Sequence, residues 1–298
     1  MVAEYKPAWA AVVVNFDAGR CLIDCVATLL LDTSAGVFEI IVVDNASTDD
    51  SISQLRQTWP DVKVILSERN LGYSGAANLG LRATRADVVV VCNPDLEIKA
   101  GTAAAMLKRF SAEPDLGALG PAVFSTSGDH YPSARQVPQL RDVVGHGTLG
   151  LVMPKNRFTR RYQELDFDPN KARDVDWVSG AMIWLRRSAL DQVGGFDDGY
   201  FMYVEDVDLC WRLGRAGWRV AYEPSGSVIH LGAVSTQRHP YRMIVAHHRS
   251  LWRFAVKRWT GVKKILLIPA AIYLSFRALT LMGFKALSLR RMSRPLKK

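Results

Sequence analysis

Residues 39–50 read EIIVVDNASTDD, an apolar run that ends in a polar cluster. A near-continuous run of Ile and Val predicts a strand that is buried on both faces of a sheet. Asp44 and Asn45 follow this strand directly, and Ser47 can cap the helix that comes next. We therefore expect all three at the carboxyl end of a buried strand, where ligands bind in such sheets. An ordinary strand-to-helix loop has the same pattern and is the alternative.

Apolar runs of the same kind recur on either side of this segment. They alternate with stretches of helical periodicity, which predicts an α/β fold with a mostly parallel central sheet flanked by helices. We expect strands at Trp9–Val14, Glu39–Val43, Val62–Leu66, Asp87–Cys92 and Trp218–Tyr222, and helices at Cys21–Leu31, Ile52–Thr58, Tyr73–Ala83, Gly101–Phe110 and Glu205–Ala216. Residues 125–176 are polar and contain several Pro residues, so we expect a long irregular segment over the face that binds ligands.

Small residues open the helix that is predicted after the third strand. Residues 69–78 read RNLGYSGAAN, and a helix start of this kind lets backbone amides approach an anion. Asn70, Gly72 and Asn78 are the candidate ligand-binding residues, although a tightly packed helix start gives the same pattern. The chain has neither the double-glycine fingerprint of dinucleotide-binding proteins nor a phosphate loop that ends in Gly-Lys-Ser/Thr, so both of these classes are excluded.

Two further segments carry candidate metal ligands. Asn93 and Asp95 follow the fourth predicted strand, and an amide oxygen beside a carboxylate suits a hard divalent cation. The alternative is a Pro turn in which Asp95 caps a helix. His230 follows a short apolar pair; neutral imidazole is a common metal ligand, although a single His is more often structural.

The most informative segment is residues 194–212, GGFDDGYFMYVEDVDLCWR. Glu205, Asp206 and Asp208 place three acids within four residues at a predicted helix start, where a cation or sugar hydroxyls would offset their repulsion. A clustered carboxylate can have a raised pKa and act as a general base. Arg212 lies four residues after Asp208 and can orient it. An exposed acidic helix start is the alternative, but the aromatic residues around the acids favour a sheltered site.

Charge is divided unevenly along the chain. Fifteen of the 38 Lys and Arg residues lie beyond Glu223, where there is no Asp or Glu, so the net charge is −6 up to that residue and +15 after it. Such a region suits an anionic membrane surface; nucleic acid is disfavoured because no recognition motif accompanies the charge. The four Cys residues are too scattered for a disulfide framework or a zinc site, and Met1–Pro7 lacks the apolar run of a signal peptide.

The basic region predicts amphipathic helices. Four of its residues form one helical stripe: Arg242, Arg249, Arg253 and Lys257. The apolar segment Ile265–Phe276 follows; its 12 residues are too few to span a bilayer, and Arg277 interrupts any longer run. We expect Pro269 to break the helix. A partly inserted, interfacial helix is favoured over a span, and a helix pair packed on the rest of the protein is the alternative.

These segments, in this order, resemble the inverting glycosyltransferase family 2, which has the GT-A fold. The similarity runs from Ala10 to Gly232, and within the family the chain is similar to the rhamnosyltransferases. It is most specific in residues 43–49, 69–73, 93–95 and 194–212.

The resemblance implies a role for each matching residue. Asp206 would be the general base, supported by Glu205, and Asp95 would bind Mg²⁺ or Mn²⁺ together with His230. Asn93 stands where the family usually has the first Asp of its metal motif, which removes one carboxylate from the cation. The nucleotide-sugar would contact Asp44, Asn45, Ser47, Asn70, Gly72, Asn78, Asn93 and Asp95. The acceptor side would contain Trp177, Ser179, Gly180, Asp208 and Arg212.

The resemblance also implies substrates and a location. The expected reaction is inverting transfer of L-rhamnose from dTDP-β-L-rhamnose to a polyprenyl-diphosphate-linked N-acetylglucosamine in cell-wall linker synthesis, at the cytoplasmic face of the plasma membrane. Galactofuranose or mannose as the donor sugar, and a non-catalytic membrane adaptor with a transferase fold, are the alternatives. A nucleotidyltransferase is disfavoured because no Gly-rich loop with a basic residue follows Val14.

Two regions are expected from the motifs and the charge. A GT-A catalytic domain would cover residues 1–236, with a nucleotide-sugar half over 1–124 and an acceptor half over 125–236. Basic helices that associate with a membrane would cover residues 237–298.

Overall fold

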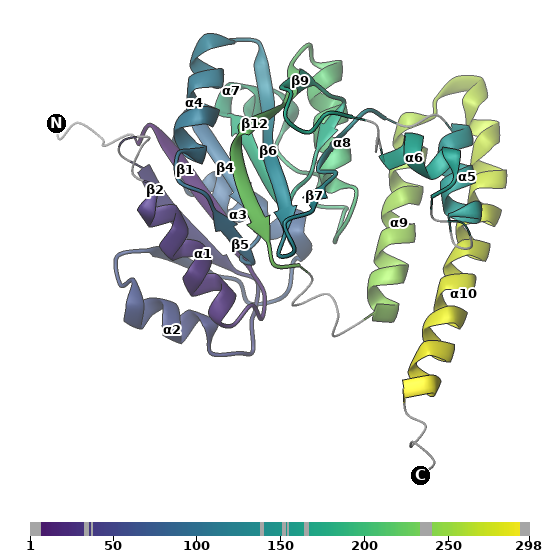
Figure 1. Cartoon of the computed structure of the whole chain (residues 1–298), viewed down its shortest axis with the longest axis horizontal. Coiled ribbons are helices and arrows are strands. Elements are labelled where there is room, and N and C mark those ends of the chain that lie inside the picture. Colours follow the sequence, from purple (N-terminus) through teal and green to yellow (C-terminus); the bar gives the residue numbers. More distant parts are fainter. Residues whose placement is uncertain are drawn as a thin grey trace.

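The computed structural model describes residues 7–32, 36, 38–137, 140–150, 153, 155–163, 167–232 and 240–292. A central sheet carries helices on both faces, and a second group of helices lies beyond one end of it (Figure 1). The main strands are β1 (Trp9–Asn15), β2 (Phe38–Asp44), β3 (Lys63–Leu66), β4 (Val88–Cys92), β5 (Leu96–Ile98), β6 (Leu116–Ser125), β11 (Met182–Arg186) and β12 (Arg219–His230). Their order across the sheet is β3-β2-β1-β4-β11-β6-β12-β5.

The first four strands of this order are parallel, as the sequence predicts. In the register of β1 and β2, Asn15 lies opposite Asp44, so both polar strand ends reach the same edge. The other half of the sheet is mixed: β11 runs antiparallel to β4 and β6, and β5 runs antiparallel to β12. The carboxyl edge of the parallel half is where ligands bind in open α/β sheets.

Helices cover the two faces of the sheet and bury its apolar side chains. They are α1 (Arg20–Leu31), α2 (Ser51–Thr58), α3 (Gly72–Arg82), α4 (Thr102–Ala112), α7 (Arg187–Val193) and α8 (Glu205–Arg215). Leu22 of α1 and Met106 of α4 pack in the core of one face, and Ala76 of α3 and Leu209 of α8 in the core of the other. Each predicted strand and helix is therefore present, although β12 continues to His230 instead of ending near Tyr222.

Residues 125–176 are more regular than the sequence predicts. Short elements occupy this segment: β7 (His130–Tyr131), β8 (Ala134–Arg135), α5 (Leu140–Leu149), α6 (Arg157–Gln163) and β9 (Arg173–Asp174), with β10 (Trp177–Val178) just after it. The prediction of an irregular segment is wrong for α5 because two glycines there permit close packing. A Cβ at Gly145 would collide with Phe158 of α6, and one at Gly147 would collide with Tyr273.

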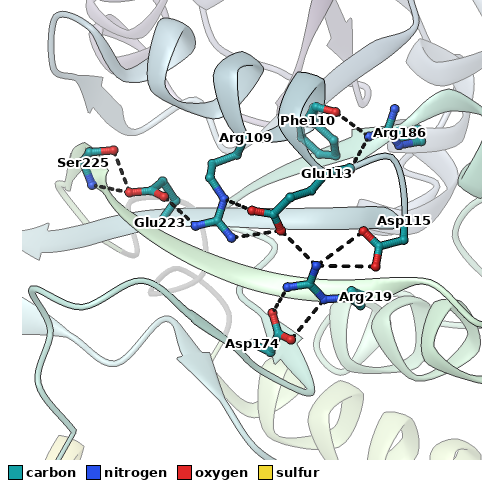
Figure 2. Close-up of polar contacts among 9 residues, drawn as sticks. All are labelled: Arg109, Phe110, Glu113, Asp115, Asp174, Arg186, Arg219, Glu223 and Ser225. Carbon is teal, nitrogen blue, oxygen red and sulfur yellow. Dashed lines mark hydrogen bonds and ion pairs between the residues drawn. The ribbon is translucent and has the colours of Figure 1, made fainter.

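A network of ion pairs joins α4 to β12 and β9 (Figure 2). Arg219 contacts Glu113 at 3.0 Å and Asp174 at 2.6 Å, while Arg109 contacts Glu113 at 2.7 Å and Glu223 at 2.8 Å. Glu113 is shared by both arginines. None of these five residues lines the large cavity described below, so the network stabilises the fold and takes no direct part in the site.

The chain ends in two long helices, α9 (Pro240–Arg258) and α10 (Leu267–Met292), joined by the 3₁₀ helix η3 (Gly261–Leu266). They lie with α5 and α6 in the group beyond the sheet (Figure 1). The predicted break at Pro269 is wrong: α10 continues through it, because Pro269 lies in the first turn, where its missing N–H has no intrahelical partner.

Among the described residues, one helical segment, Gly261–Ala286, is long and apolar enough to cross a membrane by length and composition, with a mean hydropathy of 1.9. Its outer face carries exposed Ile268, Ile272, Phe276 and Leu279, each 67–70% accessible. These residues recur at spacings of three and four and form a continuous apolar stripe. We call them the outer stripe of α10.

Candidate active site

One large cavity, of about 1530 Å³, opens at the carboxyl edge of the sheet and extends to α5, α9 and α10. It brings together most of the site residues that the sequence predicts. Those that line it are Asn45, Asn70, Gly72, Asn93, Asp95, Trp177, Ser179, Gly180, Glu205, Asp206 and His230. Segments far apart in the chain therefore share one chamber.

Asn45 organises the side of the cavity that follows β2. Its Oδ1 accepts from the Leu71 amide at 2.8 Å, and its Nδ2 donates to Asn70 Oδ1 and Gly72 O, both at 3.1 Å. Gly72 has φ +75°, and a Cβ there would collide with the carbonyl oxygen of Phe201. Only glycine therefore fits at the point where the start of α3 meets the loop before α8.

Asp44 and Ser47 lie behind this wall and do not line the cavity. Asn15 Nδ2 donates to Asp44 Oδ1 at 2.9 Å and to Ser47 Oγ at 3.1 Å, and the Ser47 amide donates to Asp44 Oδ2 at 3.2 Å. Both residues thus shape the loop after β2.

Asp95 and His230 meet because of strand register. His230 pairs with Leu96 across β12 and β5, and the Leu231 amide donates to the Asp95 carbonyl at 3.0 Å. The Asp95 Oδ1 atom lies 3.2 Å from His230 Nε2, and it is buried with no hydrogen-bond partner among the described residues. A carboxylate oxygen and an imidazole nitrogen therefore face one another without a strong partner, which suits a shared cation.

Asp206 is fixed in the first turn of α8 by two backbone amides. Gly180 N donates to its Oδ2 and Val207 N donates to its Oδ1, both at 2.8 Å. Tyr73 OH donates in turn to the Gly180 carbonyl at 2.5 Å. The carboxylate is half-buried and lines the cavity, so it is held in one orientation while a ligand can still reach it.

Glu205 and Asp206 are neighbouring acids in a low-dielectric environment. Burial and the charge of Asp206 raise the pKa of Glu205 well above its usual value. Burial also raises the pKa of Asp206, although the amides of Gly180 and Val207 act in the opposite direction. Glu205 Oε2 is buried with no hydrogen-bond partner among the described residues. A carboxylate with a raised pKa is a stronger base, so Asp206 is suited to accept a proton.

The backbone directly before these acids is strained. Tyr203 and Val204 have φ of +68° and +70°, values that β-branched and aromatic residues rarely adopt. Ser250 of α9 donates to the Met202 carbonyl at 2.9 Å, and Phe254 of α9 packs on Val204. Helix α9 therefore supports the strained turn that presents Glu205.

Besides Asp44 and Ser47, three more predicted site residues lie outside the cavity. Asn78 bonds the backbone of Phe196 and the Asp198 side chain, so it fixes the segment before α8. Arg212 Nε donates to Asp208 Oδ2 at 2.7 Å, which confirms the predicted i,i+4 pair. Asp208 is fully buried, however. In this structure the three residues make structural contacts, and their predicted ligand contacts stay a prediction.

The basic stripe of α9 also differs from its prediction as a membrane-facing surface. Arg253 forms a bidentate pair with Asp197, and Lys257 contacts Asp197 at 2.8 Å and Asp208 at 2.6 Å. This part of α9 therefore packs on the rest of the protein, as in the alternative of a packed helix pair, but these two charges are paired with acids, whereas that alternative expected them to be solvated. Arg249 is exposed.

Sequence reasoning missed several residues that line the cavity. Arg135 of β8 lies over the Trp177 ring at 5.2 Å, and Tyr73, Arg242, Tyr273 and Arg277 also line the cavity. Arg135 was hidden in a segment that reads as irregular. Arg242, Tyr273 and Arg277 lie in the segment that the sequence predicts to associate with a membrane. The one sequence signal for an anion site there is the lack of acids beyond Glu223.

The family model for glycosyl transferase family 2 matches residues 10–194, which is more than half of the chain. The chain belongs to this family. A second model, glycosyl transferase family group 2, matches residues 155–294. The protein is thus a glycosyltransferase, and the family membership that the sequence predicts is confirmed.

Two relatives of this glycosyltransferase are informative. The N-acetylglucosaminyl-diphospho-decaprenol L-rhamnosyltransferase of Mycobacterium tuberculosis is 41% identical over 261 residues, 84% of each chain. The rhamnosyltransferase WbbL of Escherichia coli is 33% identical over 129 residues, 43% of this chain and 46% of its own.

Solved structures show the same fold at low identity. The mannosyltransferase PcManGT of Pyrobaculum calidifontis, in complex with GDP-Man and Mn²⁺, has a TM-score of 0.57 at 20% identity and covers 96% of this chain and 81% of its own. GalNAc-T7 with UDP, GalNAc and Mn²⁺ has a TM-score of 0.57 at 15% identity and covers 78% of this chain and 45% of its own. The predicted GT-A-like fold of the glycosyltransferase is confirmed.

Proposed function

We propose that this glycosyltransferase transfers L-rhamnose, with inversion, from dTDP-β-L-rhamnose to N-acetylglucosaminyl-diphospho-polyprenol in cell-wall linker synthesis. The observation that carries the proposal is the 41% identity, over 84% of both chains, to the mycobacterial L-rhamnosyltransferase. The cavity supports it, because it contains a positioned carboxylate at Asp206 and enough volume for two substrates.

The geometry of Asp206 suggests how the residues of the chain act. Its carboxylate takes the proton from the acceptor hydroxyl while that oxygen attacks the anomeric carbon, and the bond from that carbon to the diphosphate oxygen breaks. Attack from the face opposite the diphosphate inverts the configuration, so a β-L-rhamnosyl donor gives an α-L-rhamnoside. The Gly180 and Val207 amides keep this carboxylate oriented, and Glu205 lies beside it as a second buried acid.

Asp95 and His230 fit a divalent cation such as Mg²⁺ or Mn²⁺. Within the described part of the chain, no group of three or more His, Cys, Asp or Glu residues is arranged to hold a metal ion, so protein ligands would supply only part of the coordination sphere. Mg²⁺ is commonly bound in this way, by one or two protein ligands together with substrate phosphates. When bound, the cation would offset the negative charge of the departing diphosphate.

We further propose a division of labour between the sheet domain, residues 1–236, and the helices of residues 237–298. The first half of the sheet domain, residues 1–124, would bind the nucleotide-sugar, and residues 125–236 would bind the acceptor sugar. The outer stripe of α10 would insert into the cytoplasmic face of the plasma membrane, where anionic lipid would attract the basic residues.

A panel of nucleotide-sugars tests the proposal. Purified protein with Mg²⁺ is offered dTDP-rhamnose, UDP-galactofuranose and GDP-mannose together with a lipid-linked N-acetylglucosamine, and transfer is measured by mass spectrometry. The expected result is rhamnose transfer alone, with an α linkage by NMR. Transfer of another sugar would replace the donor assignment, and no transfer with any donor would favour the adaptor alternative.

A further inference from the structure

We propose that Lys263 and Arg277 form a binding site for the diphosphate of a prenyl-diphosphate acceptor, separate from the donor side of the cavity. The inference rests on the proposed function, because it assigns the lipid-linked substrate to particular residues. It places the acceptor head group at the part of the cavity wall that η3 and α10 form.

The first observation is position. Lys263 of η3 and Arg277 of α10 line the same cavity as Asp206, together with Arg242 and Arg258 of α9. The donor-side residues Asn45 and Asn70 belong to the sheet edge, whereas all four of these cations come from the C-terminal helices. One chamber thus has two sides of different chemistry.

The second observation is charge. Beyond Glu223 the sequence contains no Asp or Glu. Within the described part of the chain, no ion pair joins Lys263 or Arg277 to an acid; Arg277 Nη1 instead lies 3.1 Å from His248 Nε2. Arg253 and Lys257 on α9, by contrast, are paired with Asp197. Cations without a counter-ion in a shared cavity are suited to an anionic ligand.

The histidines beside Arg277 do not compete for that anion as cations. Burial, His248 and Arg277 together lower the pKa of His247 to about 4, so His247 is neutral at physiological pH. Burial and Arg277 likewise lower the pKa of His146. The positive charge of this side of the cavity therefore resides on Lys and Arg.

The third observation is the apolar wall beside the cations. Leu266, Pro269 and Leu274 line the cavity on the same helices, and Trp259 lies at the end of α9. The outer stripe of α10 occupies another face of the same helix. Cations that line the cavity, beside an apolar helix, match an amphiphile with an anionic head and a long hydrocarbon tail. A free phosphate or a soluble nucleotide would use only the first of these features.

Equilibrium binding of radiolabelled farnesyl diphosphate tests the site without any sugar transfer. The cavity variant is Lys263→Gln with Arg277→Gln. The matched control is Lys264→Gln with Arg249→Gln, which removes the same charge from exposed positions on η3 and α9 that do not line the cavity. We expect the cavity variant to bind about tenfold or more weakly, because two charge-assisted contacts are lost, and the control to bind as the parent does.

Two further measurements make the result decisive. Inorganic pyrophosphate should compete only at far higher concentration than unlabelled farnesyl diphosphate, and the KM for the nucleotide-sugar should be unchanged in both variants. Equal loss of binding in both variants, or equal competition by pyrophosphate, would overturn the proposal.

The melting temperature of each variant checks that it is folded. Arg277→Lys is a second control, because it keeps the positive charge and should retain farnesyl diphosphate binding. Because no sugar is involved, a different donor sugar would leave the binding result intact. Rhamnose transfer with a normal acceptor KM in the cavity variant would remove this site while leaving the proposed function standing.

Discussion

Lys257 of α9 donates to Asp208 of α8, with 2.6 Å between Nζ and Oδ1, and so ties a C-terminal helix to the helix that carries Asp206. Asp208 is fully buried, and its other oxygen accepts from Arg212. The pair makes α9 part of the framework of the active site.

Lys257→Met should destabilise the protein by about 1–3 kcal/mol, because it leaves a buried carboxylate with one cation instead of two. Urea unfolding measures the loss, and the transfer rate should fall with it while the KM of the nucleotide-sugar stays constant. Arg249→Met is the control, since Arg249 is exposed on the same helix. Unfolding free energies that agree between the two variants would show that the contact is unimportant.

Asp206→Asn should reduce the transfer rate by about 10²–10⁴-fold, the usual contribution of a general base. The amide keeps an oxygen for the Gly180 N–H, so the fold and nucleotide-sugar binding should persist. Calorimetric titration of the donor and single-turnover transfer separate the two effects. Asp208→Asn does not test the base, because Asp208 is buried and its loss would lower the stability of the protein. A variant that transfers at the parental rate would remove Asp206 as the base.

As the pH is lowered, kcat/KM should begin to fall at a higher pH than it would if the base were an aspartate with an ordinary pKa. Burial raises the pKa of Asp206, and only the deprotonated form accepts a proton, so kcat/KM should drop as the pH falls through that raised pKa. The measurement is kcat/KM from pH 4 to 9, with circular dichroism at each pH to confirm folding. A rate that stays level down to about pH 4, the usual value for Asp, would contradict it.

Chelation with EDTA should abolish transfer, and added Mg²⁺ or Mn²⁺ should restore it. His230→Ala should raise the metal concentration needed for half-maximal rate, because it removes one of the two proposed protein ligands. His130→Ala is the control, since His130 contacts Tyr222 and does not line the cavity. Full turnover in excess EDTA would eliminate the metal role.

Introducing charge on the outer stripe of α10 should weaken adsorption to membranes. Ile268→Glu with Phe276→Glu changes two side chains that are 67% and 70% exposed, so the fold should tolerate it. Sedimentation with vesicles that contain anionic lipid is the measurement, and less protein should pellet than for the parent. A control pair at Ser53 and Gln57, both exposed on α2 far along the chain, should have no effect when changed to Glu. Equal pelleting by both would place membrane contact elsewhere.

Much of the sheet domain was predictable because strong local signals agree with the fold. The Ile and Val runs before Asp44 and Asp95 are buried strands, as predicted. The predicted helix start at Gly72 is also present, and the structure explains the glycine, because a Cβ there would collide with Phe201. Asp95 and His230 are far apart in sequence; their meeting depends on the pairing of β5 with β12, which no local pattern encodes.

The C-terminal helices were less predictable for a related reason. Arg253 and Lys257 look like members of a solvated or lipid-facing stripe until Asp197 and Asp208 are placed against them. Pro269 reads as a helix breaker unless the position of the helix start is known. Both depend on tertiary context, which spacing alone does not supply.

The contact of α9 with α8 has a practical consequence for producing this enzyme. Cutting the gene just after the last strand, the usual way to obtain a water-soluble catalytic fragment, would discard the partners of two acids that the remaining fragment retains. A better soluble form would keep the chain whole through Lys257 and replace apolar groups on α10 alone. Proteins shortened or altered in these two ways should differ in expression yield.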